Sequence, residues 1–325
     1  MRISRRPILH GLLGGTALLA FGLADSAWAA GYGESPQLAE LVKAGKLPPV
    51  DQRVPIDAEV VKPLESIGTY GGRIRFGLRG SSDYNNTLRM AGPQGLVRWN
   101  PDYTEIIPNV AKSWDVNDDA TVFTFHLRRG MKWSDGAPFD ADDVIFNMED
   151  IVLAGTLAPT PPRYMANGQP VKVEKVDDVT VRFTFAAPYG DFLAELASPL
   201  GQHPVLYQKK YCSQFLPKYN ADAEAQAKAA GSSDWQTFFV SKCGDIEVAS
   251  RWGNPDRPTL DPWIVKEPYV GGAVRVVMER NPYFWQVDTE GHQLPYIDEL
   301  FSPIAQDVES LILEAVGGKI DFQIR

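Results

Sequence analysis

Residues 108–144 read PNVAKSWDVNDDATVFTFHLRRGMKWSDGAPFDADDV, and this stretch decides the fold. Asn-Asp-Asp at 117–119 predicts a turn, because short polar side chains bond to their own backbone. Residues 122–127 alternate like a half-buried strand. Asp135-Gly136 is a hairpin-type turn, and Asp140 can cap a helix whose first-turn acids favour its positive end. The stretch predicts a strand, a turn and a capped helix in that order.

The same stretch resembles the signature region of the extracellular solute-binding proteins of the peptide/nickel type, family 5, which feed ABC importers. GTYGGRIRFG at 68–77 and NPYFWQVDTEGHQLPYID at 281–298 are similar to the same family. The signature itself is expected to be scaffold and not a ligand contact. The resemblance covers nearly the whole chain but only the N-terminal portion of a family member. It therefore implies one lobe, with the second lobe missing from a partial or truncated product.

The predicted fold is α/β, a periplasmic-binding-protein-like lobe with a mixed sheet and an inserted smaller α/β subdomain. Residues 30–68 are predicted to wrap around the lobe. The first part of lobe I is assigned to 69–104, the inserted subdomain to 105–198, and the return into lobe I to 199–325.

Local patterns place further elements along the chain. Residues 171–185 read as a β-hairpin, and 274–278 as a buried strand. Asp307 to Val316 reads as a helix ended by two glycines. Residues 251–263 carry three prolines and are predicted to form a long loop. Asp321 is expected to start another strand.

Residues 1–29 have the features of an export signal. Ser4-Arg5-Arg6 followed by an apolar core indicates a twin-arginine type, and an ordinary secretion signal is the alternative. Ala27-Trp28-Ala29 suggests cleavage after Ala29. The core is too short for a membrane span. Either signal predicts a soluble protein of the periplasm.

Composition and cysteine content narrow the class of protein. The 325 residues carry a formal net charge of −9, which argues against nucleic-acid binding. The hydrophobic content of 44% suits a substantial core. Cys212 and Cys243 could form a disulfide in an oxidising compartment, and the alternative is two separate buried thiols. No pattern of a metal or cofactor site is present.

Three groups of loop residues are candidates for ligand binding, because loops on a rigid scaffold usually carry binding. The first group follows an early strand, where the carboxyl ends of strands open toward a cleft. It contains Ser81, Ser82, Asp83, Tyr84 and Asn85. The alternative for this group is a solvated loop.

The other two groups lie in proline-rich loops. Arg163 with Tyr164 could meet an anionic group such as a peptide carboxylate, or lie on a plain surface loop. Arg251, Trp252 and Trp263 offer stacking faces for a side chain or a sugar ring, or pack as core under their loop.

Two kinds of function remain open at this stage. The resemblance implies a monomeric receptor that captures peptides reversibly between two lobes and delivers them to a membrane permease and its ATPases, without bond cleavage. Oligosaccharides, opines and metal chelates are alternative ligands. A secreted hydrolase would need a nucleophile or metal motif, and the sequence shows none. A truncated lobe with no transport role is a third possibility, and it would expose an apolar patch.

Overall fold

A mixed five-stranded sheet forms the centre of the main lobe in the computed structural model, which describes residues 31–323. Strands β12, β13 and β15 are antiparallel, while β2 and β3 run parallel to β15. The predicted mixed sheet is therefore confirmed. The bounds of its strands are β2 Arg73–Arg75, β3 Leu78–Arg79, β12 Trp263–Glu267, β13 Arg275–Arg280 and β15 Glu299–Ala305. The predicted export signal lies outside the described residues.

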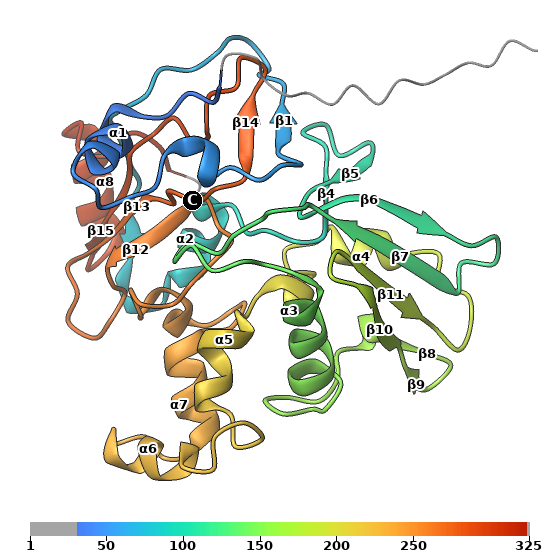
Figure 1. The fold of residues 1–325 in the computed structure, drawn as a ribbon. Coiled ribbons are helices and arrows are strands. Elements are labelled where there is room, and N and C mark those ends of the chain that lie inside the picture. Colours follow the sequence, from blue (N-terminus) through green and yellow to red (C-terminus); the bar gives the residue numbers. More distant parts are fainter. Residues whose placement is uncertain (1–30, 324–325) are drawn as a thin grey trace, which may run out of the picture. The chain divides into compact units, whose positions relative to one another are not determined.

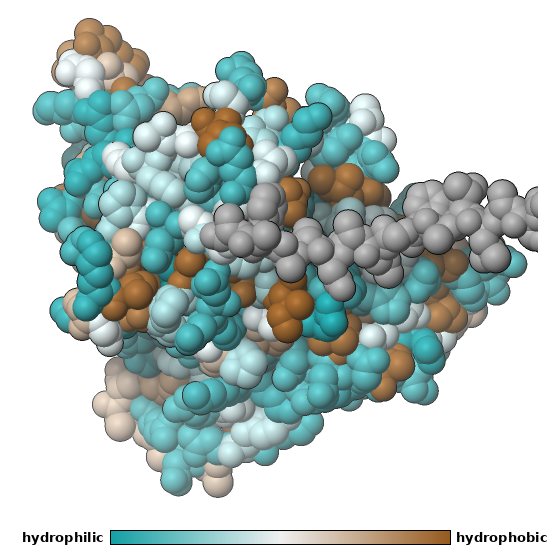
Figure 2. Space-filling view, turned by 45° about the horizontal axis from the view of Figure 1, so that its top comes forward, coloured by the Kyte–Doolittle hydropathy of each residue, from teal (hydrophilic) through white to brown (hydrophobic). Residues whose placement is uncertain are grey.

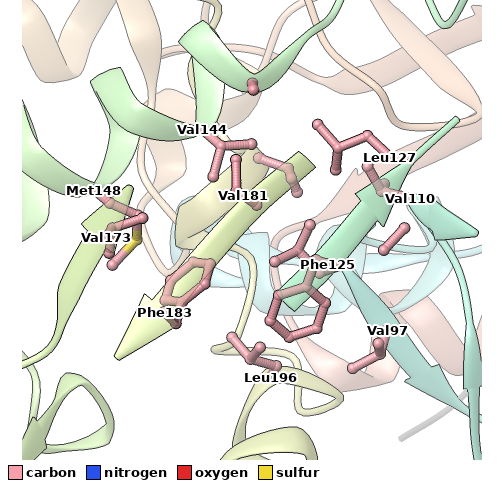
Figure 3. Close-up of a cluster of buried hydrophobic side chains, with 14 of the residues drawn as sticks. Val97, Val110, Phe125, Leu127, Val144, Met148, Val173, Val181, Phe183 and Leu196 are labelled. Carbon is pink, nitrogen blue, oxygen red and sulfur yellow. The ribbon is translucent and has the colours of Figure 1, made fainter. Parts of the chain in front are cut away.

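A second sheet has four antiparallel strands, in the order β10, β11, β7, β6. Phe183 of β11 pairs with Phe123 of β7, and Val181 with Phe125. Phe125, Val181 and Phe183 gather with Val144 and Met148 of the neighbouring helix in the cluster that Figure 3 shows. The strands are β6 Ala111–Val116, β7 Val122–Leu127, β10 Lys172–Asp177 and β11 Thr180–Thr184.

The signature stretch folds as predicted, into strand, turn and capped helix. Helix α3 (Ala141–Ile145) begins at Asp140, whose side chain accepts a hydrogen bond from the backbone N–H of Asp142 at 2.8 Å. It continues as a π-helix over Phe146–Val152. The Trp133 indole donates to the buried Asp143 carboxylate at 2.9 Å. The signature is thus built into the core, as expected of scaffold.

Short hairpins and helices flank the four-stranded sheet. Its hydrophobic cluster reaches back to Leu96 and Val97, which precede the boundary predicted at 105. That boundary cuts a hairpin, and we propose moving it to about residue 95. The flanking elements are β4 Val97–Trp99, β5 Ile106–Pro108, β8 Met165–Ala166, β9 Gln169–Pro170 and α4 Phe192–Leu196.

Side chains of α2, α5 and α7 pack with strands of the five-stranded sheet in a second hydrophobic cluster. Cys212 at the end of α5 and Cys243 at the end of α7 are joined as a disulfide, with their Cα atoms 5.9 Å apart. Figure 1 shows α5, α6 and α7 gathered together. The bounds of these helices and of α8 are α2 Tyr84–Ala91, α5 Lys209–Cys212, α6 Ala223–Ala229, α7 Trp235–Cys243 and α8 Val308–Val316.

The N-terminal segment packs along residues 280–298, as a wrapping segment would. It contains α1 (Pro36–Lys43) and β1 (Glu59–Val61), which pairs in parallel with β14 (Gln286–Asp288). Arg53 is fully buried, donates to the Pro48 carbonyl at 3.0 Å and to the Gln293 side chain at 2.9 Å, and pairs with Glu34.

Two local predictions are wrong. Trp263 does not lie in a loop but begins β12, because the strand pairs with β13 from that residue. Residues 321–323 form no strand; the backbone N–H groups of Asp321 and Phe322 instead both donate to the Arg75 carbonyl, at 2.8 and 3.2 Å.

The surface shown in Figure 2 is mostly hydrophilic, with scattered hydrophobic residues. In the described part of the chain, no helix combines the length and the apolar character needed to cross a membrane.

Candidate functional site

The first predicted group lies where two parallel strands end together. Strands β2 and β3 run one after the other along β15 in the same direction, and β3 and β15 end at the paired residues Arg79 and Ala305. Their carboxyl ends therefore meet at one edge of the sheet. A 3-10 turn over Gly80–Ser82 follows β3 and leads into α2. We call residues Gly80 to Asn85 the site loop.

One tyrosine from a distant part of the chain fixes the backbone of the site loop. The Tyr269 hydroxyl donates to the Gly80 carbonyl at 2.7 Å and accepts from the Asp83 N–H at 3.1 Å. Burial raises the pKa of Tyr269, so the hydroxyl stays protonated. The Asp83 carboxylate also accepts from the Arg79 N–H at 3.0 Å. These three hydrogen bonds fix the backbone of the site loop, as binding loops need.

The site loop borders a cavity that carries charges of both signs. Its volume is about 180 Å³, and its lining is Arg79, Asp83, Val308, Leu311 and Gln323. Ser82 is exposed, whereas Asp83, Tyr84 and Asn85 are half-buried. The buried amide oxygen of Asn85 has no hydrogen-bond partner among residues 31–323. With Asp83, Arg79 and two apolar side chains in the lining, solute groups could find an acceptor, a cation and apolar contacts in this cavity.

The second predicted group does not come together at an open surface. Tyr164 is 0% exposed and packs in the first hydrophobic cluster, with its ring 5.9 Å from that of His203. Arg163 is half-buried beside it. Since a fully buried ring cannot meet a ligand, we leave Tyr164 out of the site.

The third predicted group lies in the interior of the main lobe. Arg251 and Trp252 are each 1% exposed, and the Arg251 guanidinium lies 2.9 Å from the Asp261 carboxylate. Trp252 belongs to the second hydrophobic cluster, and the half-buried Trp263 packs against that cluster. Their proline-rich loop folds inward, so the structure favours the core interpretation for this group.

Sequence reasoning missed Tyr269, Arg79 and Gln323. Tyr269 reaches the site loop across 186 residues of sequence, and the Gln323 side chain across 246 residues to the Gly77 backbone. Arg79 could have been included, because it lies only two positions before Ser81, the first residue of the predicted group. Within residues 31–323, no cluster of three or more His, Cys, Asp or Glu side chains could hold a metal ion.

Comparison with known proteins identifies relatives of two ligand types. The periplasmic alpha-galactoside-binding protein of Rhizobium meliloti is 32% identical over 296 residues, covering 80% of this chain and 37% of that protein. The dipeptide-binding protein of Escherichia coli is 35% identical over 187 residues, covering 51% and 33% of the two chains.

Solved structures agree with the sequence relatives. The oligopeptide-binding protein OppA matches with a TM-score of 0.80 and 38% identity, over 89% of this chain and 44% of that one. The periplasmic binding protein MelB of Agrobacterium fabrum C58, in complex with stachyose, matches with a TM-score of 0.69 and 28% identity, over 90% and 43%. The chain spans less than half the length of these relatives.

The family model described as bacterial extracellular solute-binding proteins, family 5 middle, matches residues 105–324. The match covers about two thirds of the chain and contains the whole signature stretch. The chain belongs to the bacterial extracellular solute-binding proteins, family 5.

Proposed function

We propose that the protein is the solute-binding component of an ABC importer in the periplasm, and that it hands its solute to a membrane permease. The site loop lies at the carboxyl edge of parallel strands, where ligands commonly bind, and is the surface that receives the solute. The single observation that carries this proposal is the site loop in a lobe that matches OppA with a TM-score of 0.80. Binding is reversible and involves no bond cleavage.

We propose peptides as the solute class. A short peptide carries an ammonium and a carboxylate group, and the cavity at the site loop offers Asp83 and Arg79, which have the opposite charges. Two of the relatives are named for dipeptides and oligopeptides. The longer relatives have room for a second lobe. Such a lobe would close over this edge by a hinge motion.

Oligosaccharides are the second candidate. The relative named for alpha-galactosides covers more of this chain than the dipeptide-binding relative does, 80% against 51%. A neutral sugar would use the hydrogen-bonding groups of Ser82 and Asn85 and would not need the charges of Arg79 and Asp83.

Isothermal titration of the full-length gene product with trialanine and with raffinose tests both candidates. Asp83→Asn and Arg79→Gln should each weaken trialanine binding about tenfold, the loss of one charge-assisted contact. Arg182→Gln, at an exposed position of β11, is the matched control and should bind as the wild type does. Raffinose binding that is weakened by Ser82→Ala or Asn85→Ala, without trialanine binding, would replace peptides by sugars, and binding of neither solute at the site loop would contradict the proposed function.

A further inference from the structure

A second cavity lies away from the site loop. Its volume is about 540 Å³, within the range of small-molecule sites. Its walls come from the β4–β5 hairpin, the end of α4 and the segment that follows α2. The lining residues used below are Pro93, Arg98, Trp99, Tyr103, Pro199 and Gln202. We call it the hairpin pocket.

Helix α2 separates the hairpin pocket from the site loop. The site loop leads into the N-terminal end of α2 at Tyr84, whereas Pro93 of the pocket follows its C-terminal end at Ala91. An eight-residue helix spans about 12 Å. Residues that line the pocket do not line the cavity at the site loop.

Two aromatic residues, Trp99 and Tyr103, line the pocket. Trp99 ends β4 and is half-buried. Tyr103 is 78% exposed and has a φ of +56°, a conformation that non-glycine residues rarely adopt. The hairpin tip holds it there, because the Tyr103 N–H donates to the Asn100 carbonyl at 3.0 Å and the Asn100 N–H to the Glu105 carbonyl at 2.9 Å. The fold thus keeps a large ring in solvent instead of burying it.

The polar groups of the pocket wall include one donor and one acceptor. Arg98 pairs with Glu59, yet its buried Nε–H has no hydrogen-bond partner among residues 31–323. Gln202 is 2% exposed, and its Oε1 is also unpartnered in this part of the chain. A buried polar atom without a hydrogen-bond partner destabilises the folded state. A ligand or water molecule that bonded to these two atoms would remove that cost.

The chemistry of the wall indicates a neutral hydroxylated ring. Glu59 offsets only part of the charge of Arg98, because Arg128 lies 3.3 Å from the same carboxylate. A hydroxyl group both donates and accepts, which suits Arg98 Nε–H and Gln202 Oε1 together. The prolines in the lining have no N–H, so an extended peptide would lack backbone donors there.

We propose that the hairpin pocket is a saccharide site distinct from the site loop. One sugar ring stacks on Trp99 and Tyr103, and its hydroxyl groups bond to Arg98 and Gln202. The site goes beyond the proposed function, since it would bind sugar whichever solute the site loop takes.

The test observes the Trp99 indole N–H by NMR in the full-length protein labelled with ¹⁵N-tryptophan. The resonance missing in Trp99→Phe identifies Trp99. Titration with raffinose should move this resonance in a saturable way. Tyr103→Asn, which tolerates the left-handed backbone, and Gln202→Met should each weaken the effect about fivefold to tenfold.

Matched controls separate this site from the site loop. Tyr219→Asn removes another exposed tyrosine, 47% exposed and outside the pocket, and should leave the Trp99 response unchanged. Asp83→Asn should also leave it unchanged. The proposal is overturned if raffinose does not move the Trp99 resonance, if the response follows Asp83→Asn, or if trialanine or cyclohexanol moves it in place of raffinose.

Discussion

Helices α3 and α8 begin in the same way and end in different surroundings. Each is capped by an aspartate whose side chain accepts a backbone N–H, at 2.8 Å from Asp140 and 2.7 Å from Asp307. In α3, Ala141 and Val144 are fully buried against the four-stranded sheet. In α8, only Leu311 is buried, while Leu313 is 72% and Val316 82% exposed.

The difference shows that local sequence sets where a helix begins, whereas packing partners decide which faces are buried. Nothing in residues 31–323 covers the apolar side of α8. The relatives are more than twice as long as the matched region. The apolar side of α8 is exposed in this structure, whereas that of α3 is buried against the four-stranded sheet.

The largest expected effect comes from the core of the inserted subdomain. Phe183→Ala should lower the free energy of unfolding by about 3–5 kcal/mol, because its ring is fully buried between the strands and α4. Leu313→Ala on α8 should change it by less than about 0.5 kcal/mol in this chain. Urea denaturation measures both. A large loss for Leu313→Ala would mean that the α8 face is already covered.

Loss of a buried ion pair should lower the free energy of unfolding more than loss of an exposed ion pair. Asp261 is 3% exposed and lies 2.9 Å from Arg251 and 3.8 Å from Arg257. Asp261→Ala leaves two buried guanidinium groups without their carboxylate, which should cost about 3–5 kcal/mol. Glu267→Ala removes the exposed partner of Arg275 and should cost less than about 1 kcal/mol. Similar losses for both variants in thermal unfolding would refute this distinction.

The disulfide should contribute less to the free energy of unfolding than a buried core side chain does, but more than a surface ion pair does. It joins residues separated by 31 positions. Closing a loop of this length contributes about 2–4 kcal/mol. The double variant Cys212→Ser and Cys243→Ser should lose that amount in urea denaturation, and reducing agent should then have no further effect. An unchanged midpoint would show that the bridge does not form.

Two carboxylates should give pH effects of opposite sign. Burial raises the pKa of Asp143 to about 6, above about 4 in an unfolded chain. The folded state therefore holds the proton more tightly, and this stabilisation is present below pH 4 and lost as the pH rises toward 6. Relative to Asp143→Asn, the wild type should lose stability over that range, on the order of 2 kcal/mol.

Asp57 provides the contrasting case. The hydrogen bond from Arg129 lowers the pKa of Asp57, so its contribution is present above about pH 4 and lost as the pH falls. Asp57→Asn should remove that acid-side loss. If the stability difference between wild type and either variant does not change with pH, the corresponding assignment fails.

Much of the scaffold could be predicted from sequence, and little of the site. The alternation of residues 122–127 and the cap at Asp140 depend on near neighbours, so pattern alone locates them. Burial of Trp252 and Arg251 depends on the second hydrophobic cluster and on Asp261, which no local pattern reveals. Tyr269 reaches the site loop only through the pairing of strands far apart in sequence.

Hydrogen exchange of the full-length protein, with and without saturating trialanine, tests the central claim most directly. If the site loop receives the solute, the amides of residues 80–87 should exchange more slowly when the solute is bound. Protection confined to other segments, or no protection despite measured binding, would contradict the account.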